Sequence, residues 1–183
     1  MSILKLSTIL FTATTLVACG GNSNIKTTSQ VDMGIKINEL NVQQVTGLSK
    51  AGNLDQRALN ECPLQTQFPT LLKEAATEKG IVVNNVTNLD TESKGYNLSV
   101  EYTHIFNSGN AFIGHNKYTQ VHLALFKDGA KISEADAGRR SGGGFAAGFK
   151  GSCSVLGRTL EANANDIVFW LSNPVDGARL GDM

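Results

Sequence analysis

The sequence lacks an excess of either positive or negative charge, because its 183 residues include 16 basic and 16 acidic residues. Proteins that bind nucleic acids usually have a strongly positive balance and a basic stripe, and here only the short pair Arg139-Arg140 stands out. A nucleic-acid partner is therefore not expected. Hydrophobic residues make up 41% of the chain, which is ordinary for a globular protein and enough to build the core of one domain.

Long apolar stretches are absent after the first eighteen residues, and a transmembrane helix needs about 20 such residues. The mature chain is therefore predicted to have no transmembrane helix. The start of the sequence is different, because Lys5 supplies one positive charge and residues 6–17 form an apolar run, which is the order of a secretion signal. We interpret residues 1–18 as a targeting segment rather than as part of the fold.

Four residues at the end of this segment, Leu16-Val17-Ala18-Cys19, resemble the lipobox of bacterial lipoproteins, in which the chain is cut before the cysteine. The resemblance implies that Cys19 carries lipid, and several acyl chains together anchor a protein almost irreversibly. The residue after the cysteine is Gly20 rather than an aspartate, and under the sorting rule of enteric bacteria this implies transport to the outer membrane. We expect the domain to face the periplasm there. Residues 19–31 are polar and predict a flexible tether.

Only three cysteines are present, and assigning Cys19 to lipid leaves Cys62 and Cys153 as one pair. An even remainder in a secreted protein predicts a disulfide, because the periplasm is oxidising. A bridge that closes a loop of about 90 residues would stabilise the fold by roughly 4 kcal/mol in the chain-entropy model. A metal site is the alternative, but the sequence has no CxxC or HExxH spacing to support it. Neither a metal nor a cofactor is predicted.

The three histidines form no recognisable catalytic group. His104 lies in register with the apolar positions of its segment and is expected to be a half-buried core residue, whereas His122 is expected on the other face. His115 lies in the polar segment 107–117, which predicts a solvent-exposed connection. Because no Ser-His-Asp or Cys-His grouping can be assembled, the chain is not predicted to be an enzyme.

Apolar periodicity predicts a single α+β domain over residues 32–174, followed by a tail at 175–183. The expected order is βαββββα, with a mainly antiparallel sheet and both helices packed on one face. Helical spacing marks one helix that Gly80 ends and another that Ser152 caps and Pro174 follows. Apolar alternation marks strands at residues 35–45, 81–83 and 96–106 and a hairpin at 118–138.

A glycine-rich run from Ser141 to Gly151 is the feature that packing explains least. It is not a nucleotide-binding motif, because Lys150 follows Phe149 and because Ala147 breaks the GxGxxG pattern. Exposed backbone N–H groups beside positive charge could hold an anion or a partner. The candidate loop consists of Arg139, Arg140, Gly142, Gly143, Gly144, Phe145, Phe149 and Lys150. The alternative is that the glycines permit positive φ or close packing while both phenylalanines are buried.

Charged residues on the second arm of the hairpin, Glu134 and Asp136 among them, indicate a solvated edge strand that discourages pairing between molecules. A paired-carboxylate hydrolase site has the same spacing and is the weaker interpretation. The aromatic residues expected in the core or at its edge are Tyr96, Tyr102, Phe106 and Trp170.

The glycine-rich run, Cys153 and the segment from Asp166 to Leu171 together resemble small, uncharacterised lipoproteins of Gram-negative bacteria. This resemblance implies no particular activity. We therefore expect a lipid-anchored binding or envelope-assembly module, with an envelope protein or a glycan as its partner. Two alternatives stay open, namely a structural or stress-related surface lipoprotein without a specific ligand and an envelope hydrolase.

Overall fold

The structure is a computed structural model that describes residues 35–110, 114–143 and 151–183. Within these ranges the chain forms helices and strands whose order begins and ends with strands. The elements are β1 (Glu39–Gln43), β2 (Gly47–Leu54), α1 (Gln56–Glu61), α2 (Leu64–Glu78), β3 (Val82–Val86), β4 (Tyr96–Asn110), β5 (Gly114–Lys127), β6 (Ala130–Gly143), α3 (Ser152–Leu171) and β7 (Ala178–Gly181).

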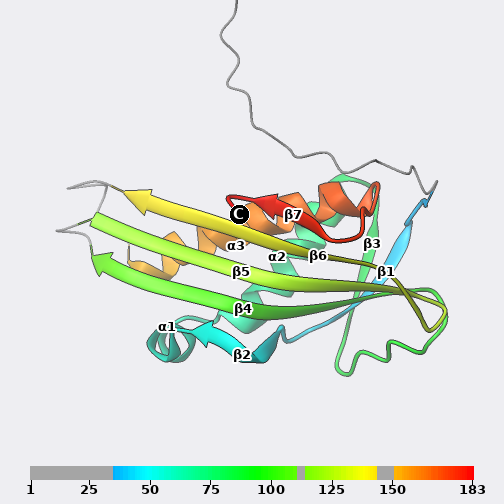
Figure 1. The fold of residues 1–183 in the computed structure, drawn as a ribbon, viewed down its shortest axis with the longest axis horizontal. Coiled ribbons are helices and arrows are strands. Elements are labelled where there is room, and N and C mark those ends of the chain that lie inside the picture. The colour runs from blue at the N-terminus through cyan, green and yellow to red at the C-terminus, as the bar shows by residue number, and fades with distance from the viewer. Residues whose placement is uncertain (1–34, 111–113, 144–150) are drawn as a thin grey trace, which may run out of the picture. The chain divides into compact units, whose positions relative to one another are not determined.

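The strands form one mixed sheet, which confirms the predicted α+β class (Figure 1). Its order is β3-β1-β4-β5-β6-β7, and β2 also pairs with β4. The long strands β4, β5 and β6 are antiparallel, whereas the pairs β1–β3, β1–β4, β2–β4 and β6–β7 are parallel. The expected order βαββββα therefore missed β2, which follows the strand expected at residues 35–45, and it missed β7.

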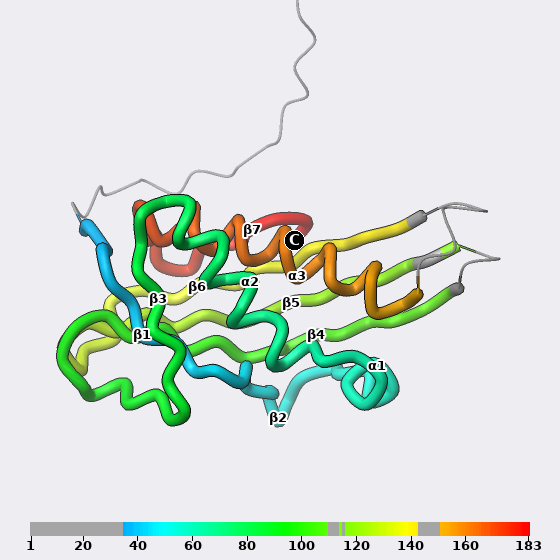
Figure 2. Tube along the Cα trace, turned by 180° about the vertical axis from the view of Figure 1, so that it is seen from behind, coloured from blue at the N-terminus to red at the C-terminus, as the bar shows by residue number. Residues whose placement is uncertain are grey.

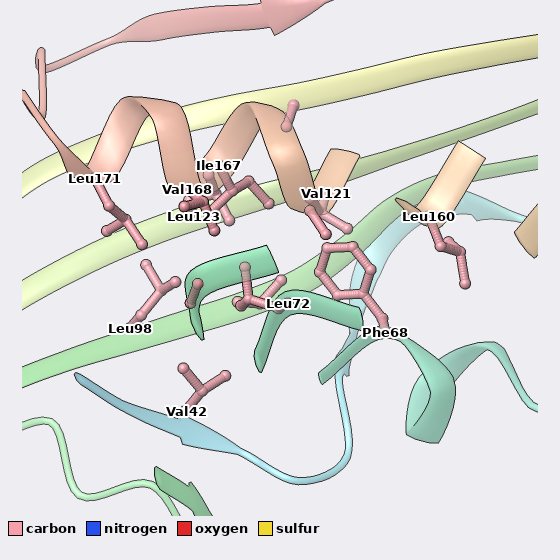
Figure 3. Close-up of a cluster of buried hydrophobic side chains, with 14 of the residues drawn as sticks. Val42, Phe68, Leu72, Leu98, Val121, Leu123, Leu160, Ile167, Val168 and Leu171 are labelled. Atoms are coloured by element: carbon pink, nitrogen blue, oxygen red, sulfur yellow. The ribbon is translucent and has the colours of Figure 1, made fainter. Parts of the chain in front are cut away.

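One face of the sheet is covered by α2 and α3, as the view from behind shows (Figure 2). The two helices contact each other, and α3 also contacts β5 and β6. Their buried side chains, among them Phe68 and Leu72 of α2 and Ile167 of α3, meet Leu98 and Val121 of the sheet in the core (Figure 3). Among the described helices, none has the length and apolar character needed to cross a membrane.

The helix α2 forms on an apolar repeat of four residues and ends at Glu78, two residues before Gly80, which has the positive φ expected of a terminating glycine. Its repeating buried residues are Leu64, Phe68, Leu72 and Ala76. Pro69 lies in the second helical turn and has no N–H to donate to the carbonyl of Gln65. The backbone N–H of Thr46 donates to that carbonyl instead, at 2.9 Å, so the proline is accommodated without leaving an acceptor unused.

Two hairpins connect the long strands. Asp128 and Gly129 form the tight turn between β5 and β6, with φ values of 50° and 87° that fit a two-residue type I′ turn. The turn was predicted, but the connection expected at residues 107–117 is largely wrong. β4 continues to Asn110 and β5 begins at Gly114, because pairing between the two strands outweighs the turn-forming composition of this segment.

A β-bulge in β4 reverses the faces expected for two residues. The pairing with β5 moves from Tyr102 opposite Val121 to His104 opposite Gln120, which leaves Thr103 as the extra residue. Tyr102 is buried, whereas His104 is exposed. The prediction of a half-buried core histidine is therefore wrong, because the extra residue shifts the alternation by one position. Phe106 shifts in the same way and is 47% exposed.

The strand β6 is not a free edge over its middle part. β7 pairs in parallel with Ala135–Gly138, and the backbone N–H of Glu134 donates to the Asp176 carboxylate at 2.9 Å. The interpretation of Glu134 and Asp136 as marks of a solvated edge strand is therefore wrong. Their partner strand comes from the segment expected to be a tail, where four residues are too few to give a strand signal.

The predicted disulfide between Cys62 and Cys153 is present, across a sequence separation of 91 residues. Cys62 lies just before α2 and Cys153 lies in the first turn of α3. The bridge therefore ties together the beginnings of the two helices that cover the sheet. Ser152 is the first residue of α3 rather than its cap, and Gly151 takes the cap position.

Candidate functional site

The second face of the central sheet is the candidate site. We call it the open face, because no helix in the described part of the chain covers it (Figure 1). Alternation along β4, β5 and β6 places buried residues under the helices and the intervening residues on the open face. The open face consists of Ser99, Glu101, His104, Phe106, Tyr118, Gln120, His122, Ala124, Glu134, Asp136, Gly138 and Arg140.

Three residues at the same level of neighbouring strands form an aromatic row. Phe106 pairs with Tyr118, and Tyr118 pairs with Arg140. The guanidinium carbon of Arg140 lies 5.7 Å from the centre of the Tyr118 ring, which is a cation–π distance. The Tyr118 hydroxyl donates to Gln120 Oε1 at 3.0 Å, and partial burial raises the pKa of this hydroxyl. The row therefore presents aromatic surface and fixed positive charge together.

The ring of Tyr118 owes its position to a glycine. A side chain at Gly138 would overlap the Tyr118 hydroxyl and would also approach Met183 closely. Gly138 pairs with Gln120 on one side and with Gly181 on the other, and it is buried because Tyr118 and Met183 cover it on the open face.

A charged row crosses four strands of the open face. Glu101 of β4 pairs with His122 of β5, His122 pairs with Asp136 of β6, and Asp136 pairs with Arg179 of β7. Arg179 lies on the same face because its neighbours Ala178 and Leu180 pack against the core. His122 Nδ1 lies 3.0 Å from Asp136 Oδ1, with both side chains 40% exposed. The row places acid, imidazole, acid and base in order within one line across the sheet.

The hydrolase interpretation gains no support from the placement of its two carboxylates. Glu134 and Asp136 lie on the open face rather than in a pocket, and Glu134 forms an ion pair of 2.5 Å with Lys131. No group of three histidine, cysteine, aspartate or glutamate side chains suited to a metal occurs within residues 35–110, 114–143 and 151–183.

The candidate glycine-rich loop is only partly described. Gly144, Phe145, Phe149 and Lys150 lie outside the described residues, as does Cys19, whereas Gly142 and Gly143 end β6. The two arginines at its start belong to opposite faces. Arg139 points to α3, where it binds Asp166, and Arg140 lies on the open face. The expected joint cluster of positive charge is therefore divided between the two sides of the sheet.

A hollow of about 370 Å³ lies beside β1 and the start of β4. Lys36, Asn41, Lys94 and Tyr96 are among its lining residues, and Lys127 lies 5.2 Å from the centre of the Tyr96 ring. Its two lysines are exposed and the hollow is open to solvent, so nothing in it fixes a charged ligand.

Sequence reasoning also missed Lys117, which is completely buried on the helix-covered side of β5. Its ammonium donates to Asn107 Oδ1, to the carbonyl oxygens of Ser108 and Gly109, and to Ser152 Oγ, at 2.5 to 3.2 Å. Burial lowers its pKa, and the charge of Asp55 opposes this effect. A lysine in a polar segment predicts a solvated side chain, so no signal in the sequence indicated this burial.

Comparison with known proteins finds distant similarity of fold alone. No family model matches the sequence, and no curated protein matches it. A minor lipoprotein from Acinetobacter baumannii aligns with 14% identity and a TM-score of 0.49, covering 75% of this chain and 92% of that one. The PelC dodecamer from Paraburkholderia phytofirmans aligns with 11% identity and a TM-score of 0.44, covering 70% and 87%. A variant of that dodecamer gives 12% identity and a TM-score of 0.41, covering 76% and 89%.

Proposed function

We propose that the chain is a lipid-anchored binding module of the bacterial cell envelope and that the open face is its contact surface. Anchoring is supported by the lipobox Leu16-Val17-Ala18-Cys19 and by the polar segment that follows it. The 15 residues from 20 to 34 reach at most about 50 Å when fully extended, so an anchored domain works close to its membrane.

The observation that carries the proposal is the chemistry of the open face. Aromatic and arginine side chains are enriched at the centres of protein interfaces, and here Phe106, Tyr118 and Arg140 are adjacent and accessible. The same face presents the charged row, which can align a partner through matched charges. A protein without a binding partner would not need aromatic, arginine and charged side chains grouped on the sheet face that the described helices leave uncovered.

A photo-crosslinking experiment tests the proposal with a pair of phenylalanines that differ in their location. Phe106 lies on the open face, whereas Phe169 lies on the outer side of α3 and is 78% exposed. Benzoylphenylalanine placed at either position of the full chain is irradiated in intact Gram-negative cells, and adducts are identified by mass spectrometry. We expect a defined adduct from position 106 and none from position 169. Adducts from position 169 alone, or from neither position, would contradict the proposal.

Anchoring is measured in the same cells by separating membranes from soluble protein. A lipid-anchored protein stays with the membrane through washes at high salt and leaves it with detergent. Release by salt would show that charge rather than lipid holds the protein, and it would contradict the anchoring part of the proposal.

A further inference from the structure

The charged row has an acid at one end and a base at the other, so its charges match those of a second, identical row laid in the reverse order. Read across the sheet, it begins with the acid Glu101 and ends with the base Arg179, with His122 and Asp136 between them. Both end residues are exposed, and within the described residues neither forms a salt bridge or a side-chain hydrogen bond. The row therefore offers one negative and one positive charge, about three strand spacings of 4.8 Å apart, to whatever contacts the open face.

A second copy of the chain satisfies both ends of this row. Consider two copies whose open faces meet across a two-fold axis parallel to the strands and midway between β5 and β6. The second copy then has its strands in the reverse order, so β4 faces β7 and β5 faces β6, and each residue keeps its position along the strand direction. Glu101 then lies opposite Arg179 of the second copy, and His122 lies opposite Asp136 of the second copy. Because such an interface uses the same patch twice, each pair is formed twice.

The aromatic row fits the same axis independently. Tyr118 and Arg140 stand on β5 and β6 at one level, so each Tyr118 ring meets Arg140 of the second copy, a pairing that cation–π attraction favours. At the level between the two rows, Gln120 lies opposite Gly138 of the second copy, which the Tyr118 hydroxyl and Met183 of that copy cover. One axis therefore pairs both the charged row and the aromatic row of the open face.

From these relations we infer that the occupant of the open face is a second copy of this chain, packed face to face. The inference rests on the proposed function, because it names the partner of the surface proposed there. Two sheets that pack in this way lie about 10 Å apart with their strands nearly aligned, which is the usual geometry of a β-sandwich.

The area of the face sets the strength of this association. Four strands spaced about 4.8 Å apart and nine residues rising about 3.3 Å each give a patch of roughly 500 Å² on each copy. The total of roughly 1,000 Å² is at the lower limit for a specific interface, so two dissolved copies associate weakly. Anchoring in one membrane raises the effective concentration of the copies, and it is there that the pairing takes place.

Charge reversal at the two ends of the row gives a selective test. Glu101→Arg and Arg179→Glu each place like charges opposite one another in a self-paired dimer, whereas a mixed pair of the two variants restores opposite charges at both ends. The full chain is expressed as two copies with different epitopes inserted in residues 20–31. Recovery of one epitope with the other after crosslinking in intact cells measures the pairing.

We expect each variant to pair with itself at least tenfold less than the original chain does, and the mixed pair to recover to within about threefold. Glu74→Arg, an equal charge change on the exposed side of α2, is expected to leave pairing unchanged. Thermal unfolding verifies that each variant folds, and Glu101→Lys with Arg179→Asp provides a second matched set should the first fold poorly. A mixed pair that recovers no better than either variant alone overturns the inference.

The crosslinking probe at Phe106 separates failure of this inference from failure of the proposed function. An adduct with a different envelope protein, together with no recovery in the mixed pair, overturns self-association and leaves the binding function supported. Absence of any adduct at this position overturns both.

Discussion

Arg139 of β6 and Asp166 of α3 are joined by two parallel hydrogen bonds across the boundary between the sheet and its helix layer. Arg139 Nε donates to Asp166 Oδ2 at 2.5 Å, and Nη2 donates to Oδ1 at 2.6 Å. Asp182 accepts a further bond of 3.3 Å from Nη1. These hydrogen bonds, that of Asp166 first, raise the pKa of Arg139, whose charge stays fixed at every physiological pH. The pair therefore sets the position of α3 on β6.

Removing the charge of Asp166 should destabilise the protein. Asp166→Asn leaves the guanidinium without its two-point partner, and because the carboxylate is only 19% exposed we expect a loss of about 1–3 kcal/mol in the free energy of unfolding. Glu134→Gln is the matched control, since its pair with Lys131 is exposed to solvent and its loss should change the free energy of unfolding little. Urea unfolding of both variants measures the difference, and equal losses would contradict a special role for Arg139.

The disulfide should account for a large part of the stability of the helix layer. Removing Cys62–Cys153 releases a loop of 91 residues in the unfolded chain, which costs roughly 4 kcal/mol in the chain-entropy model. Cys62→Ser with Cys153→Ser should therefore unfold at much lower denaturant concentration than the oxidised protein, and at the same concentration as the original protein under reducing conditions. If reduction leaves the unfolding midpoint unchanged, the bridge has no such effect.

The parts of the fold that sequence could predict depend on local periodicity. The buried faces of α2 and α3 and the turn at Asp128-Gly129 follow from spacing within one segment. The bulge at Thr103 has no such signature, because one extra residue changes the faces of His104 and Phe106 without altering the composition. The strand β7 was missed because four residues are too few for their alternation to indicate a strand.

The candidate site was less accessible to prediction for a related reason. The charged row joins residues of four strands, and their alignment depends on strand register, which the sequence of one strand does not contain. Each member alone resembles an ordinary exposed residue. Only the pairing places Glu101 and Arg179 at the two ends of one line.

The proposed lipid anchor predicts that membrane fractionation of the protein changes when Cys19 is replaced. Cys19→Ala removes the sulfur to which lipid would be attached, so the protein should remain uncleaved or move to the soluble periplasmic fraction. Ser23→Ala, a change of similar size in the adjacent segment, should leave membrane retention as it was. Unchanged retention of the Cys19 variant, measured by membrane fractionation and by mass of the N-terminal peptide, would contradict lipidation.

The buried ammonium of Lys117 gives the stability of the protein an unusual dependence on alkaline pH. Burial lowers the pKa of this amine below the ordinary value of 10.5, so the folded protein releases the proton at a lower pH than the unfolded chain. Between those two pKa values the unfolded state binds more protons, and the free energy of unfolding therefore rises with pH. Tyr102, whose pKa burial raises, acts in the opposite direction above about pH 10.

Comparison with Lys117→Met isolates the contribution of this amine, because Tyr102 titrates in both proteins. Below about pH 10.5, the ordinary pKa of the amine, the free energy of unfolding of the original protein should rise with pH relative to that of the variant, by no more than about 1.4 kcal/mol per pH unit. Lys73→Met, at an exposed position of α2, should show no such difference. Urea unfolding at several pH values provides the measurement. Parallel pH profiles for the original protein and Lys117→Met would mean that the amine titrates alike in the folded and unfolded chains, contrary to its complete burial.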